Sequence, residues 1–104
     1  MNRVAFKMKL HKDCAQEYKK RHDEVWPDLA KMLNRAGIRD YSIFLDQETN
    51  ILFAILKIID TKELETLPAL AVMQEWWKYM SDIMETNPDH SPIVSELTEM
   101  FYLS

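Results

Sequence analysis

Three segments of the chain alternate apolar and polar side chains, as half-buried β-strands do. In residues 4–10, apolar side chains occupy every second position. Residues 38–45 alternate in the same way, with Tyr41 on the same face as the apolar residues two and four positions later. Residues 97–103 repeat the pattern at the end of the chain. Each of these segments is therefore predicted to form a strand with one apolar face.

A fourth strand is expected at residues 51–59, where almost every side chain is apolar. Such a run is typical of a strand that is buried on both faces, whereas one layer of helices covers only one face of a sheet. The polar turn at residues 46–50 joins this strand to the preceding one as a hairpin. The second apolar face needs a partner sheet, and in a chain this short we expect another subunit to supply it.

A first helical region lies between the first two strands. Over residues 15–29, side chains of one face recur at spacings of three and four, after an expected N-cap at Asp13 with Gln16 as its capping-box partner. Pro27 should make the helix kink or restart. The only glycine, Gly37, suits the left-handed position that ends a helix.

The second helical region follows the hairpin and completes the order of elements. Residues 61–67 begin a helical turn that Pro68 interrupts, and residues 69–84 carry apolar side chains at helical spacing. Turn-forming residues fill positions 87–92. The resulting order is β-α-β-β-α-β, the split βαβ or ferredoxin-like arrangement of an α+β fold. We expect a single domain, residues 1–104, whose sheet faces that of a second copy in a dimeric α+β barrel.

Composition and charge narrow the possible functions. The formal net charge is −4 and the cationic side chains are scattered, which disfavours nucleic acid as a partner. A chain with one glycine has no glycine-rich phosphate loop. Cys14 is the only cysteine, so an intrachain disulfide is excluded and a reducing, cytoplasmic location is expected. No signal-peptide region or bilayer-length apolar segment is found, so we expect no membrane partner.

Tyr18 and His22 are the first candidates for chemistry. They lie four residues apart on the first helix and are therefore neighbours on its apolar face. Histidine is the side chain best suited to move protons near neutral pH, because its ordinary pKa is about 6.5. The alternative is a structural histidine whose hydrogen bonds serve only the fold.

Trp76 and Trp77 are adjacent on the second helix, so their side chains point about 100° apart. In one interpretation, one tryptophan belongs to the core and its neighbour covers the core edge. In the other, the pair is a platform for a sugar, since the axial C–H groups of a pyranose are apolar and indole or phenol donors reach its hydroxyls. Trp26 and Tyr41 are candidates for the same surface.

The other polar candidates have simpler explanations. His11 and His90 are expected in solvent, and Asp89 either shapes a site or simply forms a turn. The three histidines lack the paired spacing of zinc ligands, and no carboxylate stands in a ligand relation to them. We therefore expect no bound metal.

Together these residues resemble the L-rhamnose mutarotases over essentially the whole chain. The resemblance rests on short motifs. Each motif alone is a weak indication of the family, but together they are specific to it. They are Ala5-Phe6, Tyr18-x-x-x-His22, Trp26-Pro27, Tyr41, Leu52-Phe53-Ala54, Trp76-Trp77-Lys78-Tyr79-Met80, Asn87-Pro88-Asp89 and Phe101-Tyr102-Leu103. The resemblance implies a homodimeric α+β barrel without a cofactor that interconverts the α and β anomers of L-rhamnose.

The resemblance also implies roles for individual residues. His22 would be the proton donor, and Tyr18, Tyr41, Trp76 and Trp77 would contact the substrate. Mutarotation takes the proton from the anomeric hydroxyl and protonates the ring oxygen, and the base is left open between Tyr18, a bound water and a carboxylate. The competing functions are a mutarotase for another sugar, a monooxygenase or other enzyme on the same barrel, and a sugar-binding or purely structural dimer.

Overall fold

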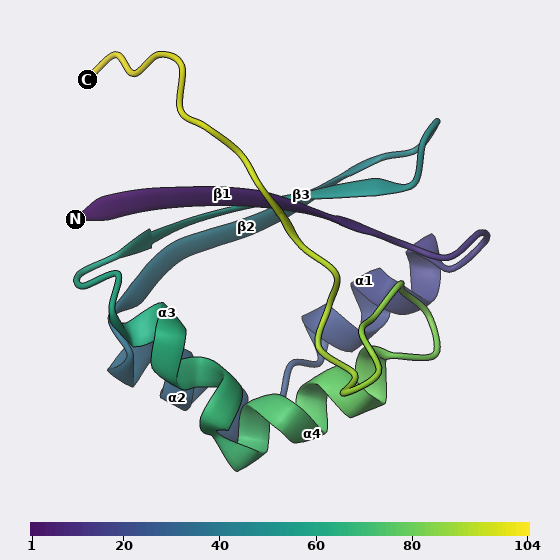
Figure 1. Ribbon diagram of the computed structural model, residues 1–104. Coiled ribbons are helices and arrows are strands. Elements are labelled where there is room, and N and C mark those ends of the chain that lie inside the picture. The colour runs from purple at the N-terminus through teal and green to yellow at the C-terminus, as the bar shows by residue number, and fades with distance from the viewer.

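One antiparallel sheet and one layer of helices make up the fold, described for residues 1–104 by a computed structural model (Figure 1). The strands are β1 (Asn2–Lys9), β2 (Ile38–Asp46), β3 (Ile51–Ile58) and β4 (Ser95–Glu96). The helices are α1 (Ala15–Asp23), α2 (Pro27–Arg35), α3 (Glu63–Thr66) and α4 (Ala71–Met80), with a 3-10 helix, η1, at Leu67–Ala69. The strand order β2-β3-β1-β4 confirms the predicted α+β, ferredoxin-like arrangement.

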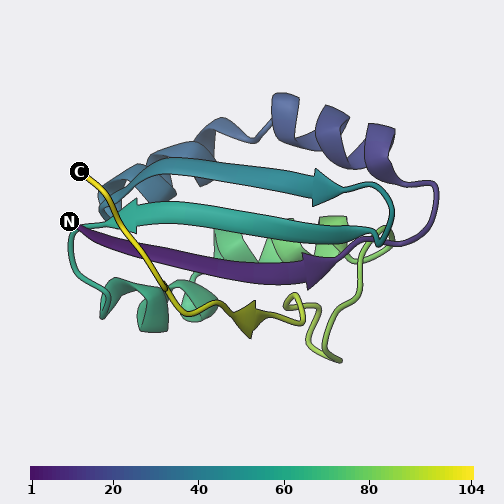
Figure 2. The same ribbon diagram turned by 90° about the horizontal axis from the view of Figure 1, so that it is seen from above.

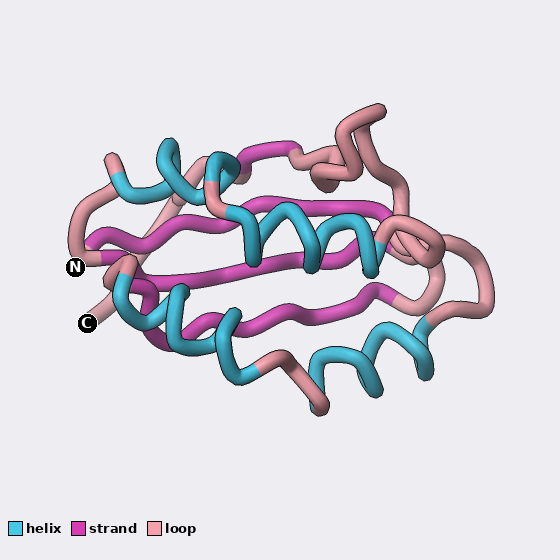
Figure 3. Tube along the Cα trace, turned by 90° about the horizontal axis from the view of Figure 1, so that it is seen from below, coloured by secondary structure: helices cyan, strands magenta, loops and turns pink.

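The helices all lie on one face of the sheet and leave the other face open (Figure 1). Figure 2 shows the three long strands side by side, with the C-terminal segment crossing β1 on the open side. Figure 3, from the opposite direction, shows the helices in front of the sheet. No helix is long and apolar enough to cross a bilayer.

The first helical region is divided in two, as Pro27 predicts. α1 ends at Asp23, Trp26 is extended with φ −60° and ψ 131°, and Pro27 opens α2 at its first position. Gly37 follows α2 with φ +87°, the left-handed conformation expected there. An added Cβ at this position would lie 3.2 Å from the Cβ of Ile59, so a larger residue would crowd that side chain in addition to straining the backbone.

The predicted N-cap at Asp13, with Gln16 as its partner, is wrong. The N-cap of α1 is Cys14, which makes no side-chain capping bond. Asp13 has φ +63° because it forms the tight turn between β1 and α1, where the N–H of Cys14 donates to the carbonyl oxygen of His11. The turn therefore overrides the capping preference of aspartate.

The second long helix is shorter than the predicted residues 69–84. α4 ends at Met80 because the chain beyond it pairs with the end of β1. Met84 forms an isolated antiparallel bridge with Leu10, and the N–H of Glu85 donates to the carbonyl oxygen of Lys9. These sheet-like bonds use backbone groups that a longer helix would need.

The predicted last strand, residues 97–103, is wrong for the single chain. β4 covers only Ser95–Glu96, and the last backbone hydrogen bond runs from the N–H of Leu97 to the carbonyl oxygen of Ala5. Beyond that bond the chain leaves the sheet (Figure 1), and no strand of the same chain lies beside it to pair with. Its apolar side chains stay in solvent, with Phe101 80% exposed.

Alternation in β3 decides which side chains face the helices. Leu52, Ala54, Leu56 and Ile58 are buried, whereas Ile55 is 42% exposed on the open face. The helices of one chain thus cover only one face of β3, as expected, and the cover of its other face by a second subunit stays a prediction.

The neighbouring strand β2 follows the same alternation. Ile43 pairs with Ala54 and Leu45 with Leu52, so both face the helices. Phe44 lies on the open face and is 61% exposed. The sequence predicted that Tyr41 shares a face of β2 with Ile43 and Leu45. The structure agrees, and this face is the inner one.

Candidate active site

His22 lies in the last turn of α1 and is half-buried. Its Nδ1 is 3.0 Å from the carbonyl oxygen of Tyr18, one turn earlier. A carbonyl oxygen only accepts hydrogen bonds, so a neutral His22 carries its proton on Nδ1 and leaves Nε2 unprotonated. Burial lowers the pKa of His22, although the bond to Tyr18 and the charge of Asp23 act in the opposite direction. The neutral imidazole is thus the form that prevails at neutral pH.

Tyr18 is buried beside His22, as their spacing predicts. The two ring centroids are 4.4 Å apart with an interplanar angle of 30°. Burial raises the pKa of the Tyr18 phenol, and the nearby Tyr41 adds to the shift. Tyr18 therefore keeps its proton at neutral pH and is suited to donate a hydrogen bond rather than to act as a base.

Tyr41 reaches the same region from β2, next to an irregularity in the sheet. The register between β2 and β3 shifts between Arg39 and Ser42, and Asp40 has φ +49°. Two-fifths of the surface of Tyr41 is exposed, but burial raises the pKa of its phenol to about 12. A second protonated phenol therefore lies close to Tyr18.

Aromatic rings from α4 and from the start of α2 continue the site. The Trp76 ring meets His22 edge to face, with centroids 5.4 Å apart. Trp26 meets Trp76 in the same way at 5.1 Å, and Tyr79 lies 5.4 Å from Trp26 and 5.6 Å from Trp76. Trp26 thus joins the cluster, as the sequence suggested. Tyr79 was not among the predicted site residues, although its position three residues after Trp76 places both side chains on one helix face.

Trp77 points elsewhere, as the 100° offset requires. Trp76 is 6% exposed, whereas Trp77 is half-buried and packs against the edge of the core. Trp77 also lines an open hollow of about 450 Å³ together with Asp89 and His90. Among the aromatic contacts, Trp77 has none with the cluster around His22. Its contact with substrate stays a prediction.

Arg21 fixes α1 against the end of α4. Its guanidinium donates to the carbonyl oxygen of Tyr79 at 2.7 Å and to both carboxylate oxygens of Asp82 at 2.8 and 3.1 Å. It also donates to Glu17 at 3.0 Å and lies 4.5 Å from the centroid of the Tyr79 ring. The sequence analysis did not predict these contacts, although the i, i+4 spacing of Glu17 and Arg21 favours an ion pair on one helix.

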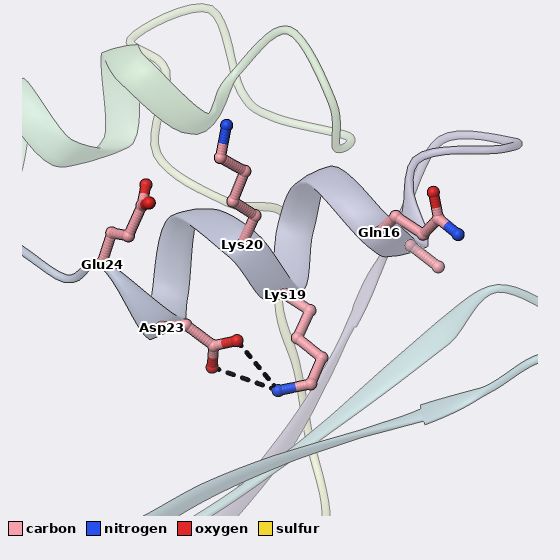
Figure 4. A pocket seen from close by; sticks show the side chains of 6 residues that line it. Gln16, Lys19, Lys20, Asp23 and Glu24 are labelled. Atoms are coloured by element: carbon pink, nitrogen blue, oxygen red, sulfur yellow. Dashed lines mark hydrogen bonds and ion pairs between the residues drawn. The ribbon is translucent and has the colours of Figure 1, made fainter.

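Three carboxylates on or beside α1 are paired with cationic side chains. A polar hollow of about 460 Å³ lies on the outward face of α1, where Asp23 binds Lys19 at 3.0 Å (Figure 4). Glu17 and Asp82 bind Arg21. No charged side chain is buried, and no three His, Cys, Asp or Glu side chains lie together as metal ligands would. The protein atoms at this site offer imidazole, phenol and indole groups.

Comparison with known proteins gives one consistent result. Residues 3–103 match the family described as L-rhamnose mutarotase. The chain is 50% identical to the L-rhamnose mutarotase of Jannaschia sp. (strain CCS1), covering 99% of both chains. It is 52% identical to that of Mesorhizobium japonicum, covering 98% of this chain and 97% of the relative. The crystal structure of L-rhamnose mutarotase from Formosa agariphila superposes with a TM-score of 0.93, at 45% identity and with both chains fully covered.

Proposed function

Because the chain belongs to the L-rhamnose mutarotase family, we propose that it is an isomerase that interconverts the α and β anomers of L-rhamnose, with His22 as proton donor to the ring oxygen. The observation that carries this proposal is the environment of His22. One ring nitrogen is held by the Tyr18 carbonyl oxygen, and the ring is enclosed by Tyr18 and Trp76. A fixed imidazole beside aromatic rings suits proton transfer to a sugar.

The reaction asks little of the protein besides proton transfer. The anomeric hydroxyl loses its proton, the bond between C1 and the ring oxygen breaks, and the ring oxygen gains a proton. The open-chain aldehyde then rotates about its C1–C2 bond and closes to the other anomer. No carbon–hydrogen bond breaks and no electron leaves the sugar, so the chemistry needs neither a redox cofactor nor a metal.

Substrate binding in this proposal uses the aromatic cluster and the two phenols. Trp76 would face the apolar side of the sugar, while Tyr18 and Tyr41, both protonated, would donate hydrogen bonds to its hydroxyls. Trp77 is included as a substrate contact through family resemblance, and the hollow beside it lies next to α4. The proposed contacts thus come from α1, β2 and α4.

The proposed active form is a homodimer in which two sheets face each other. The open face of the sheet carries Phe44, Ile55 and Ile59, each more than 40% exposed in the single chain. The C-terminal segment after Leu97 extends on the same side and exposes further apolar side chains (Figure 1). A second copy of the chain would cover both. A reducing location such as the cytoplasm is part of the proposal, because Cys14 is a free thiol.

The test of the proposed function is exchange spectroscopy by NMR on L-rhamnose, with and without the protein. The expected result is faster exchange between the α and β resonances in proportion to protein concentration. Sugar-dependent tryptophan fluorescence without faster exchange would instead indicate a binding protein. Oxygen uptake with aromatic substrates would favour a monooxygenase on the same fold.

A further inference from the structure

The reaction needs a base, and the structure restricts which groups can supply it. The proton of the anomeric hydroxyl must leave before or while the ring opens. A bound water is a far weaker base than a neutral imidazole, so the groups of the protein that could act as the base are a phenol, a carboxylate and the imidazole itself. Each can be judged from the groups that face His22 on the elements packed around it.

The phenols are poor bases because both keep their protons. On α1, burial raises the pKa of Tyr18, and on β2 burial raises that of Tyr41 to about 12. A phenolate at either position would require a pH far above neutral. From α4 the ring that contacts His22 is Trp76, an indole without a basic nitrogen.

No carboxylate forms a hydrogen bond or an ion pair with His22. Asp23, whose charge raises the pKa of His22, lies on the same helix and points outward to Lys19. Glu17 and Asp82 are both bound by Arg21. Asp23 and Asp82 are exposed and Glu17 is half-buried, and none of the three lies among the buried side chains.

His22 itself is oriented to accept a proton. Its Nδ1–H donates to the carbonyl oxygen of Tyr18, so the lone pair of the neutral ring lies on Nε2. The same bond keeps Nδ1 protonated when Nε2 gains a proton. Nε2 of His22 can therefore gain and lose a proton without rotation of the ring.

We propose that Nε2 of His22 is both the base and the acid of the reaction, and that it moves one proton from the anomeric oxygen to the ring oxygen. This inference rests on the proposed mutarotase function. Both oxygens are bonded to C1, so they are closer together than the two ends of a hydrogen bond, and one nitrogen can reach each in turn.

The bonds and protons balance within this step. The O–H bond of the anomeric hydroxyl breaks and its proton joins Nε2, while the oxygen forms the C=O bond of the aldehyde. The bond between C1 and the ring oxygen breaks with its electron pair on the ring oxygen, which takes the proton back from Nε2. The neutral imidazole is regenerated. Closure on the other face of the aldehyde runs the same steps in reverse.

We call this mechanism, in which His22 is both base and acid, the proton shuttle. The pH dependence of kcat/KM for anomer exchange distinguishes the shuttle from a mechanism with a separate base. In the shuttle the reactive form is neutral His22, so kcat/KM rises with pH through the pKa of His22 and then stays level. Below that pKa it falls about 10-fold per pH unit. If His22 acts only as a donor that starts protonated, kcat/KM falls above its pKa, and a level alkaline limb is not seen.

The experiment measures exchange between L-rhamnose anomers from pH 5 to pH 9, with the spontaneous rate subtracted. The matched control is His11→Gln, which removes an exposed imidazole outside the site and should keep the wild-type profile. His22→Ala with added imidazole gives an independent measurement. Rescue should grow with the concentration of neutral imidazole as the pH rises.

A bell-shaped profile, or rescue that follows the imidazolium ion, would overturn the shuttle while leaving the mutarotase function in place. Absence of protein-dependent exchange at every pH would instead remove the proposed function on which the shuttle rests.

Discussion

The guanidinium of Arg21 donates a 2.7 Å hydrogen bond to the carbonyl oxygen of Tyr79 and so joins α1 to the end of α4. Because the Arg21 side chain is only 12% exposed and also binds Glu17 and Asp82, several charge-assisted bonds depend on it. We expect Arg21→Gln to lower the free energy of unfolding by about 1–3 kcal/mol, the range for hydrogen bonds to charged groups. Urea denaturation followed by circular dichroism measures this loss.

Lys19→Gln is the matched control for Arg21. It removes a salt bridge on the same helix, to Asp23, but both side chains are more than 60% exposed. Exposed i, i+4 pairs contribute little, so the expected loss is below about 0.5 kcal/mol. Equal losses for the two variants would show that Arg21 does not hold the helices together.

His22→Ala should lower the anomer-exchange rate by about 10²–10⁴-fold, the usual range for one acid or base group. This corresponds to about 2.7–5.5 kcal/mol in the barrier. His22→Gln keeps a polar side chain and tests whether polarity alone is enough. The secondary structure of both variants is checked by circular dichroism. A folded His22→Ala protein with unchanged exchange would transfer the acid role to another residue.

The lowered pKa of His22 also predicts how stability depends on pH. Since burial holds this pKa below the ordinary value of 6.5, the unfolded chain binds the proton at a higher pH than the folded protein does. The contribution of His22 to stability should therefore decrease as the pH falls through 6.5 toward the folded-state pKa, and then become constant. His22→Gln should remove this dependence.

This dependence is measured as the difference in unfolding free energy between each variant and the wild type, from pH 5 to pH 8. For His22→Gln the difference should change across the window, with the variant gaining relative stability at acid pH. A constant difference for His22→Gln would mean that the histidine is not desolvated in the folded state.

Much of the fold could be predicted because periodicity and tertiary packing agree in the long elements. The alternation that placed Tyr41 on the inner face of β2 agrees with the observed pairing of Ile43 with Ala54. The wrong predictions occurred where the local sequence pattern favours one structure and the surrounding chain favours another. Asp13 has the chemistry of an N-cap, yet the turn into α1 uses it with a positive φ angle. Residues 97–103 alternate like a strand, yet a strand needs a neighbour, which one chain does not supply.

The sequence predicted which side chains form the candidate site, but it did not predict their hydrogen bonds. Helical spacing placed Tyr18 beside His22, because residues four apart share a face. Spacing could not show that Nδ1 of His22 bonds to the backbone of Tyr18, which decides the tautomer. It could not show the Arg21 contacts with α4 either, since these join segments about sixty residues apart.

The open face of the sheet predicts the oligomeric state. We expect the wild-type protein to sediment as a dimer at micromolar concentration, because burial of the exposed Ile55 and Phe44 against a second sheet is favourable. Ile55→Asp would place a charge in that interface and should give a monomer. Gln16→Asp adds the same charge on the outward face of α1 and should leave the dimer intact (Figure 4). A wild-type monomer with full activity would contradict the dimer.

Specificity should be strict toward the ring hydroxyls and lenient at carbon six, a hypothesis based on the protonated phenols of Tyr18 and Tyr41 and on the aromatic ring of Trp76. A site that hydrogen-bonds a hydroxyl can reject an analogue lacking that group by about 10⁴–10⁵, whereas an apolar pocket rejects an added hydroxyl by only about 10². L-mannose carries one added hydroxyl, at carbon six, and should be a poorer but measurable substrate. Anomer exchange for L-rhamnose, L-mannose and L-fucose gives three second-order rate constants to compare. If L-fucose were fastest, the assignment to rhamnose would fail while the mutarotase class would stand.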